Sequence, residues 1–332
     1  MNDLDTTTTR TGSAVVLGSI NIDNFIYVQA FPEPGETILA QGGTAGLGGK
    51  GANQAVAASL FGTTVHFVGQ VGRDGGADFV RDRLEGFGIA STLLMTSPDA
   101  PTGAAYITVN ASGENTIAVV SGANADIDAA QLGETVGRVL AQTTAPATVA
   151  LAQGETSAAA TAAFVRQCHA HGVRVVINLA PAIALPADVL RLADPLIVNE
   201  GEARILLDRF AGRGVPLTDP ESAAAAAQTL AAMVAASVVI TLGPDGAVGA
   251  DGAGVWHQPS PVPEAVVDTT GAGDAFVGAL VSLLAAGASL REAVRWGVAA
   301  GSAAVGKRGT TTAYPTRGEL ATVLANSSGV AL

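Results

Sequence analysis

The stretch VVDTTGAGDAFVGAL (Val266–Leu280) places a polar, glycine-rich segment directly before a strongly apolar one. AVVD (265–268) predicts a strand and AFVGALVSLLAAG (275–287) a buried helix, so that TTGAGD (269–274) forms the helix N-terminus. The first N–H groups of a helix lack intrahelical partners, and the helix dipole is positive there. The stretch therefore predicts an anion site with Asp274 at its mouth.

Asp274 has two interpretations at this position. Glycine lets the backbone approach a transferring phosphoryl group closely, and a carboxylate beside it can take a proton from an attacking hydroxyl. The alternative is an ordinary acidic residue in the first turn of a helix, where the dipole favours negative charge.

The rest of the chain repeats a unit of apolar helix followed by β-branched strand. Three such units cover residues 52–72, 158–180 and 224–243. This alternation predicts an α/β fold with a doubly wound, mainly parallel sheet flanked by helices. We expect one domain over residues 14–325, preceded by a flexible threonine-rich tail at 1–13.

Polar residues follow the predicted strands. SAVVLGSINID (13–23) predicts one buried strand that delivers Asn21 and Asp23 at its carboxyl end. In open α/β sheets, ligands bind at the carboxyl ends of the strands. We therefore expect a site formed by the polar residues at five such ends, namely Asp23, Asn178, Asn199, Thr241 and Asp268.

Two other regions, at about 24–45 and 103–120, contain alternating or aromatic strands broken by proline and glycine. They predict a small separate β-sheet inserted into the α/β domain.

GLGGKGANQAV (46–56) matches the spacing of a dinucleotide-binding turn, but no acidic residue ends the following strand and no clear strand precedes the glycines. A dehydrogenase is therefore disfavoured. A P-loop also fails, because no Ser or Thr follows Lys50 and Thr44 replaces the first glycine. A glycine-rich turn remains that presents Lys50 and Asn53 to a polyhydroxy or anionic ligand, or else a tight turn with a solvated lysine.

Three further segments carry alternatives. Asn199 and Glu202 in VNEGEA (198–203) have a spacing that suits a hydrated Mg²⁺ or a helix cap. Thr241 and Gly243 suit a nucleotide lying along exposed backbone, or an ordinary glycine turn. Glu155 precedes a helix, which it could cap.

Composition excludes several classes of function. The net charge of -12 disfavours nucleic acid, and one cysteine, Cys168, cannot form an internal disulfide. No signal-peptide pattern is present, so we expect a cytoplasmic protein. The low-charge run 222–243 predicts a helix and a buried strand in place of a membrane span. CHAH (168–171) lies at the end of a predicted helix. Histidines there interact favourably with the helix dipole, so a metal site is disfavoured.

Four motifs, in order, carry a resemblance that covers about residues 14–320. They are GSINID (18–23), GGKGANQAVAA (48–58), NEGE (199–202) and DTTGAGDAF (268–276). With them the chain resembles the ribokinase branch of the PfkB sugar kinases. The resemblance implies ATP-dependent phosphorylation of a primary sugar hydroxyl, with the 5-hydroxyl of D-ribose as the best match. It also implies that the small sheet is a lid and the interface of a homodimer.

The resemblance assigns roles residue by residue. Asp274 would be the general base beside an anion hole of Gly271, Ala272 and Gly273. The sugar would be held by Asn21, Asp23, Gly49, Lys50, Asn53 and Glu155, with Ala105, Ile107 and Ile117 as apolar lid contacts. Asn199 and Glu202 would organise Mg²⁺, the latter through water, and Thr241, Gly243 and Gly246 would lie along the nucleotide. A K⁺ site would involve Asp268, Thr270, Ala304, Lys307 and Gly309, mostly through backbone carbonyls.

The chain departs from the family pattern at two positions. Ala313 stands where a serine commonly completes the K⁺ site, so a neighbouring threonine or water replaces that ligand, or K⁺ dependence is weakened. Val198 stands where proline commonly precedes the asparagine.

The identity of the phosphoryl acceptor stays open, with ribose, 2-deoxyribose, fructose and a ribonucleoside as the alternatives. The carboxylate of Asp23 suits a sugar with a vicinal diol. The alternative to an enzyme is a non-catalytic sugar-binding protein with the same fold.

Overall fold

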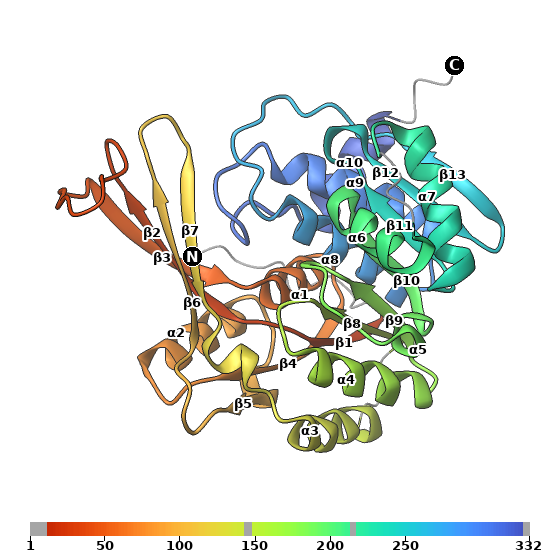
Figure 1. The fold of residues 1–332 in the computed structure, drawn as a ribbon, viewed down its shortest axis with the longest axis horizontal. Helices are drawn as coiled ribbons and strands as arrows, with labels where there is room; N and C mark the ends of the chain where they lie inside the picture. The colour runs from red at the N-terminus through yellow and green to blue at the C-terminus, as the bar shows by residue number, and fades with distance from the viewer. Residues whose placement is uncertain (1–11, 143–147, 213–216, 328–332) are drawn as a thin grey trace.

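The computed structural model describes residues 12–142, 148–212 and 217–327. Within these residues the chain forms a nine-stranded sheet and a separate four-stranded sheet (Figure 1). Residues 1–11 of the predicted tail lie outside the described residues, whereas Ser13 is already the first residue of a strand.

The large sheet is mainly parallel, as predicted. Its order is β13-β12-β11-β10-β9-β8-β1-β4-β5, and among its described strands only the pairs β11–β12 and β12–β13 are antiparallel. Its strands are β1 (Ser13–Leu17), β4 (Thr64–Val71), β5 (Leu94–Thr96), β8 (Val149–Gln153), β9 (Arg174–Asn178), β10 (Ala193–Asn199), β11 (Val238–Thr241), β12 (Ala247–Asp251) and β13 (Gly254–Gln258).

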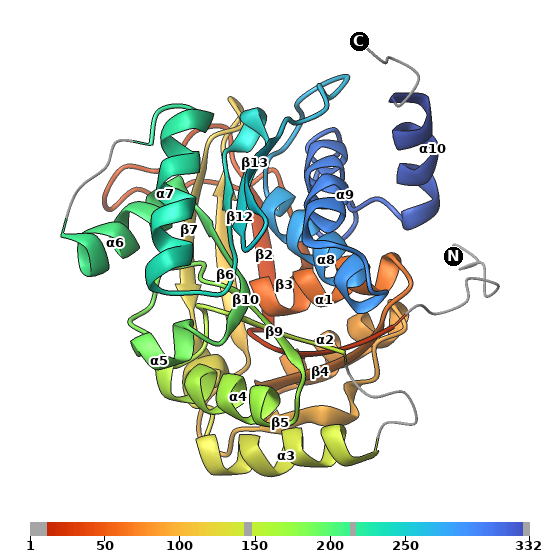
Figure 2. The ribbon, with the colours of Figure 1, turned by 90° about the vertical axis from the view of Figure 1, so that its right-hand side faces the viewer.

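Helices cover both faces of this sheet (Figure 2). One face packs against α1 (Lys50–Leu60), α2 (Gly75–Gly86), α8 (Ala272–Ala285), α9 (Leu290–Ala304) and α10 (Arg317–Ser327). The other packs against α3 (Ala129–Gln142), α4 (Ala158–Ala170), α5 (Ala187–Leu190), α6 (Glu200–Ala211) and α7 (Pro220–Met233). Successive side chains of a strand point to opposite faces, so Ala14 and Val16 join the first core while Val15 and Leu17 join the second.

The small sheet extends from one side of the molecule in Figure 1, with the order β3-β2-β6-β7. Its strands are β2 (Asn21–Tyr27), β3 (Gly42–Gly48), β6 (Gly103–Val109) and β7 (Asn115–Val120). The sheet thus includes residues 21–23 and 46–48, which lie outside the expected 24–45.

The single strand predicted over 13–23 is wrong, because β1 and β2 belong to different sheets. The chain leaves the large sheet after Leu17, and the side chain of Asn124 binds both the N–H and the C=O of Ile20. These bonds satisfy backbone groups that a continuous strand would have paired with a neighbour. Asn21 and Asp23 consequently begin a strand of the small sheet, in contrast to the prediction that they end a strand of the large one.

Two other local predictions are corrected. Residues 265–268 form no strand, because Val267 and Asp268 both donate their N–H groups to the carbonyl of Val305 in a loop. The glycine run before Lys50 is itself a strand, β3, although we expected no strand there.

The three predicted helix–strand units are confirmed as α1–β4, α4–β9 and α7–β11. The low-charge run 222–243 accordingly forms most of α7 followed by β11. No helix in the described part of the chain combines the length and apolarity that a membrane crossing requires.

Candidate active site

The glycines around Gly18 and Gly51 let the two N-terminal motifs pack directly against each other. A Cβ atom on Gly51 would lie 2.5 Å from the Gly18 Cα, and one on Gly49 would lie 2.9 Å from the Ser19 carbonyl oxygen. Gly49 also has a φ of 86°, which side chains rarely tolerate. These glycines let β3 turn into α1 beside the start of β2, so that Lys50 is the first residue of α1.

Helix α8 approaches α1 closely where both carry small residues. A Cβ on Gly278 would collide with the Ala57 Cβ and lie 2.7 Å from the Gln54 carbonyl oxygen. The approach brings Asp274 within reach of α1. Asn53 Nδ2 donates to Asp274 Oδ2 at 3.0 Å, and Gln54 Nε2 donates to Asp274 Oδ1 at 2.8 Å.

Asp274 is therefore not an ordinary acidic residue on a solvated helix end, since it is only 8% exposed and points toward α1. Burial raises the pKa of Asp274, and Lys50, Gln54 and Asn53 partly oppose this by favouring the ionised carboxylate. A carboxylate with a raised pKa that is held by fixed donors has the properties expected of a general base.

The N-terminus of α8 lies beside this carboxylate. Gly271 is the N-cap residue with a φ of 77°, and a Cβ there would lie 2.6 Å from the Tyr314 hydroxyl oxygen. Of the three predicted anion-hole residues, Ala272 uses its N–H in a 3.3 Å bond to the Thr269 carbonyl, while Gly271 and Gly273 line a cavity in front of the carboxylate. The turn is open to an anionic ligand at a helix N-terminus.

Glu155 joins two segments that are distant in sequence. Its Oε2 accepts from Ser19 Oγ at 2.6 Å and from the Lys50 backbone N–H at 2.9 Å, and its Oε1 lies 3.9 Å from Lys50 Nζ. It caps α1, and the alternative that it caps the following helix is wrong, because Ser157 is the N-cap residue of α4.

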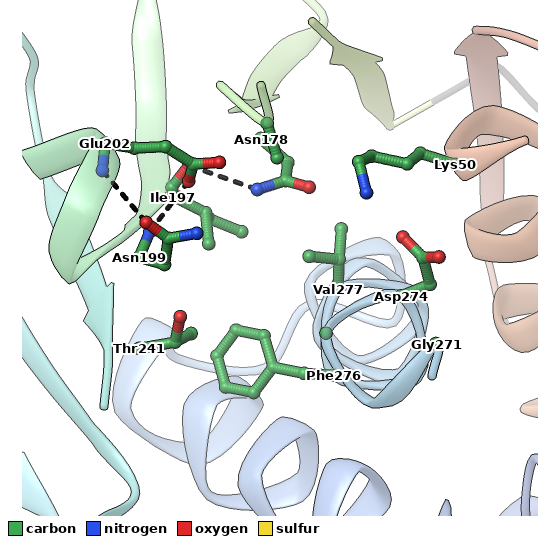
Figure 3. A pocket seen from close by; sticks show the side chains of 12 residues that line it. Lys50, Asn178, Ile197, Asn199, Glu202, Thr241, Gly271, Asp274, Phe276 and Val277 are labelled. Carbon is green, nitrogen blue, oxygen red and sulfur yellow. Dashed lines mark hydrogen bonds between the residues drawn. The ribbon is translucent and has the colours of Figure 1, made fainter. Parts of the chain in front are cut away.

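Lys50 lies among four carboxylates. Burial lowers the pKa of Lys50, but Asp274, Glu155, Glu202 and Asp23 outweigh it and raise the net value above that of an ordinary lysine. Lys50 therefore carries its charge at neutral pH, and its side chain lies near Asp274 on the same side of the cavity in Figure 3.

Asp23 lies at the other side of the lysine, where its carboxylate packs over Gly48 with no room for a Cβ. Burial, together with Glu155 and Asp274, raises the pKa of Asp23 to about 7, although Lys50 lowers it. The nearby Asn21 is oriented by Asn124, whose Nδ2 donates to Asn21 Oδ1 at 2.8 Å.

The face of the small sheet that carries Asp23 also carries the expected apolar contacts. Asp23 is in register with Ala105, and Ile107 on β6 is in register with Ile117 on β7. Ala105 and Ile107 are buried, but Ile117 on the outer strand is 55% exposed. The structure places the first two beside Asp23 and leaves Ile117 on the exposed margin of the sheet.

A cavity of about 210 Å³ separates Lys50 and Asp274 from the ends of β10 and β11 (Figure 3). Asn199 Oδ1 accepts from the Glu202 N–H at 2.9 Å, and Glu202 Oε2 accepts from the Asn199 N–H at 2.8 Å. The helix-cap alternative for these two residues is thus confirmed. The cap uses one oxygen of the Glu202 carboxylate, and the residue still lines the cavity.

The residues here fit Mg²⁺ only in its hydrated form. No three His, Cys, Asp or Glu side chains in the described ranges gather as they would around a metal, at CHAH or elsewhere. Mg²⁺ keeps several waters and is typically bound through one or two carboxylates together with substrate phosphates. Asn199 and Glu202 suit that mode. Burial raises the pKa of Glu202, whereas the Asn199 backbone and Lys50 lower it.

A second cavity, of about 540 Å³, adjoins the first, because Thr241, Gly273 and Phe276 line both. Gly243 and Gly246, the other residues expected along the nucleotide, also line it. The remaining walls are largely apolar residues of α9 and of the segment around residues 260–266, as is common in pockets for an aromatic base.

Asp268 ties together the two segments expected to hold K⁺. Its Oδ1 accepts from the Thr270 N–H at 2.9 Å and its Oδ2 from the Gly309 N–H at 3.0 Å. Burial raises the pKa of Asp268, but these bonds outweigh it and leave the pKa below its usual value. One ionised carboxylate between two loops fits a monovalent cation bound by backbone carbonyls.

The two remaining K⁺ residues, Ala304 and Lys307, are joined by a 3.2 Å bond from the Lys307 N–H to the Ala304 carbonyl. Ala313 is buried, and its N–H donates to the carbonyl of Thr310.

Sequence reasoning missed several residues that build the site. Gln54 and Gln153 form hydrogen bonds beneath Asp274 together with Asn178, which was expected at the end of its strand, and Asn124 orients Asn21. Gln54 had a detectable signal, since it is a polar residue within a largely apolar helix. Gln153 and Asn124 had none, because their roles depend on contacts with segments distant in the sequence.

A buried carboxylate at a helix N-terminus lines a polar cavity at the carboxyl ends of parallel strands, and a largely apolar cavity adjoins it. This is the arrangement expected of a small-molecule kinase site. The model of the pfkB family of carbohydrate kinases matches residues 11–317, and the chain belongs to this family.

Curated relatives include a ribokinase of Haemophilus influenzae, 38% identical over 304 residues, which cover 92% of this chain and 95% of the relative. A deoxyribokinase of Salmonella typhi is 31% identical over 301 residues, or 90% and 94% of the two chains. Among solved structures, the Arabidopsis thaliana ribokinase complexed with ribose and ATP matches with a TM-score of 0.83 and 28% identity over 95% of this chain and 99% of that one.

Proposed function

We propose that this chain is an ATP-dependent kinase that phosphorylates the 5-hydroxyl of D-ribose to give ribose 5-phosphate. The observation that carries the proposal is the Asp274 carboxylate, which two residues of α1 hold at the N-terminus of α8. It lies between the cavity lined by Asn199 and Glu202 and the segment that carries Asp23. The ribokinases among the relatives support ribose and ATP as substrates.

In this mechanism, Asp274 accepts the proton of the attacking hydroxyl, and the N-terminus of α8 stabilises negative charge on the transferring phosphoryl group. Lys50 faces Asp274 and supplies a fixed positive charge. Mg²⁺, when bound with ATP near Asn199 and Glu202, neutralises phosphate charge. Closure of the small sheet over the sugar excludes water and limits ATP hydrolysis.

Asp23 selects the acceptor. A buried carboxylate can accept hydrogen bonds from two neighbouring hydroxyls, and a sugar that lacks one of them leaves the carboxylate partly unpaired. Ribose is therefore favoured over 2-deoxyribose. Fructose is the other monosaccharide from which the site has to distinguish ribose.

One observation favours a ribonucleoside as the second candidate. A cavity of about 430 Å³ adjoins Asn21 and Glu155, extends to Val119 and Pro181, and includes neither Lys50 nor Asp274 in its lining. The nucleobase of a ribonucleoside would occupy this space, at the end of the sugar that lies away from Asp274.

The first experiment measures ADP release with Mg²⁺ and K⁺ over ribose, 2-deoxyribose, fructose and ribonucleosides. A preference for ribose supports the proposal, whereas a preference for a nucleoside moves the assignment to the second candidate. Sugar binding by calorimetry without ADP release would instead identify a non-catalytic binder.

The decisive variant is Asp274→Asn, which keeps the size of the side chain and removes the base. We expect sugar binding to be retained and turnover to fall by about 10²–10⁴-fold, the usual contribution of a general base. Near-normal turnover would refute the assignment of Asp274.

A further inference from the structure

Gln54 lies beneath the site, fully buried between α1, α8 and the large sheet. Its Nε2 donates to Asp274 Oδ1 and to Asn178 Oδ1, each at 2.8 Å, and its Oε1 accepts from Gln153 Nε2 at 2.9 Å. Asn178 in turn donates to the Ile197 carbonyl on β10 at 3.2 Å. One amide therefore connects the carboxylate to three strands of the sheet.

These partners allow only one orientation of the Gln54 amide. If the amide were flipped, its oxygen would face the oxygens of Asp274 and Asn178, and its nitrogen would face the nitrogen of Gln153. Every bond would then join two acceptors or two donors, which is unfavourable in a buried site. The Gln153 side chain has space because Gly18 lacks a Cβ, which would otherwise collide with the Gln153 Oε1.

The two donors from α1 fix the carboxylate as well. Asn53 binds Oδ2 and Gln54 binds Oδ1, so both oxygens are held and the carboxyl plane cannot rotate without breaking a bond. Each oxygen keeps a lone pair for a proton. Because Gln54 is excluded from solvent, it has no route to the sugar or the nucleotide except through Asp274 and Asn178.

We propose that Gln54 is a positioning residue that holds the Asp274 carboxylate ionised and correctly oriented, with its own amide locked by Gln153 and Asn178. The proposal rests on Asp274 being the base in the proposed function. It assigns to the chemical step a residue that contacts neither substrate.

The other charged or titratable groups that act on Asp274 come from several elements. Lys50 of α1 favours the ionised carboxylate, whereas Glu155, after β8, and Asp23 of β2 oppose it. Tyr314 lies nearby, and its hydroxyl is held neutral because burial, Asp274 and Asp23 raise its pKa. Removal of the Gln54 donor therefore shifts the balance toward the protonated carboxyl, which cannot act as a base.

The test is the pH dependence of single-turnover phosphoryl transfer at saturating sugar in Gln54→Leu. We expect the acidic limb to move to higher pH by about one unit, since a hydrogen bond to a charged group is worth about one pKa unit. The rate should fall by about tenfold below the limb and recover toward the wild-type value at high pH. The KM for sugar should change by less than about twofold, because the residue touches no substrate.

Ser282→Ala is the matched control. Ser282 is a fully buried residue of α8 that accepts from Thr63 Oγ1 at 2.7 Å, just after the end of α1, so the variant weakens a buried contact of α8 away from Asp274. We expect a lower melting temperature and an unchanged pH profile. If Gln54→Leu fails to fold, Gln153→Leu provides the second test, with a smaller shift in the same direction because the Gln54 amide loses its lock.

Two outcomes separate this proposal from the proposed function. If Asp274→Asn is inactive but both glutamine variants keep the wild-type pH profile, Gln54 is only structural and the positioning role is refuted. If Asp274→Asn is nearly as active as the wild type, the assignment of the base fails, and the role of Gln54 fails with it.

Discussion

Under the proposed function, the ionised Asp23 carboxylate binds the sugar, whereas the same ionisation lowers the stability of the fold. Its pKa of about 7 in the folded chain exceeds the usual 3.8, so the folded state holds the proton more tightly than the unfolded state does. The stability associated with this group is complete below about pH 4 and is lost as the pH rises through 7. Above pH 7, the chain keeps an ionised carboxylate that disfavours folding and that is the form the proposed function needs for sugar binding.

We therefore expect Asp23→Asn without sugar to raise the free energy of unfolding at pH 8, by up to roughly 4 kcal/mol for a shift of about three pKa units. The gain should be clearly smaller at pH 5, while sugar affinity falls at both values. Denaturant titrations at the two pH values measure this. Asp82→Asn, at an exposed position on α2, is the control, and a gain independent of pH would contradict the pKa argument.

At the scale of elements, the contact between α1 and α8 sets the position of the Asp274 carboxylate. Gly278 lies one turn after Asp274, and its missing Cβ lets α8 approach Ala57 and the Gln54 backbone. The same approach allows Asn53 and Gln54 to reach Asp274. Packing of the two helices and alignment of the carboxylate therefore depend on the same glycine.

We expect Gly278→Val to destabilise the chain by about 1–3 kcal/mol, the usual cost of overpacking. Turnover should fall more than sugar affinity, because a displaced α8 moves Asp274 away from its donors. Thermal unfolding and steady-state kinetics measure the two effects. Gly133→Ala is the control on α3, where the nearest atom to a new Cβ is 3.7 Å away, and it should leave both unchanged or gain slightly in stability.

For the whole molecule, the small sheet leaves apolar side chains uncovered. Ile117 and Val119, on the same face of β7, are more than half exposed, at 55% and 59%. Contiguous exposed apolar residues commonly mark an interface. We propose that two copies of the chain pair through this sheet, as the family resemblance implied.

Ile117→Asp should therefore shift the mass in solution from twice the chain's 32.8 kDa toward that of a single chain, because a charge in an apolar interface is costly. Light scattering after gel filtration measures the mass. Ile205→Asp on α6, at 54% exposure, is the matched control and should stay dimeric. A wild type that elutes as a monomer would refute the proposal.

Prediction from the sequence succeeded where local pattern decides the structure. Alanine-rich segments such as 224–233 and β-branched runs such as 238–241 carry their period within themselves, and the order of these elements defines a parallel α/β fold. It failed at 13–23 and 265–268, where short apolar runs are compatible with either strand or loop. In both cases, hydrogen bonds from a distant segment, at Asn124 and Val305, decide the path of the chain.

The sequence by itself determined the alternation of helices and strands, the start of a buried helix within residues 269–274 and the place of Asp274 in its first turn, because each is encoded within about ten neighbouring residues. Only the tertiary structure decided how that carboxylate is held. The partners of Gln54 lie 99, 124 and 220 residues away in the chain, at Gln153, Asn178 and Asp274. A hydrogen bond needs its two atoms within about 3 Å, and no local pattern specifies that distance between segments so far apart in sequence.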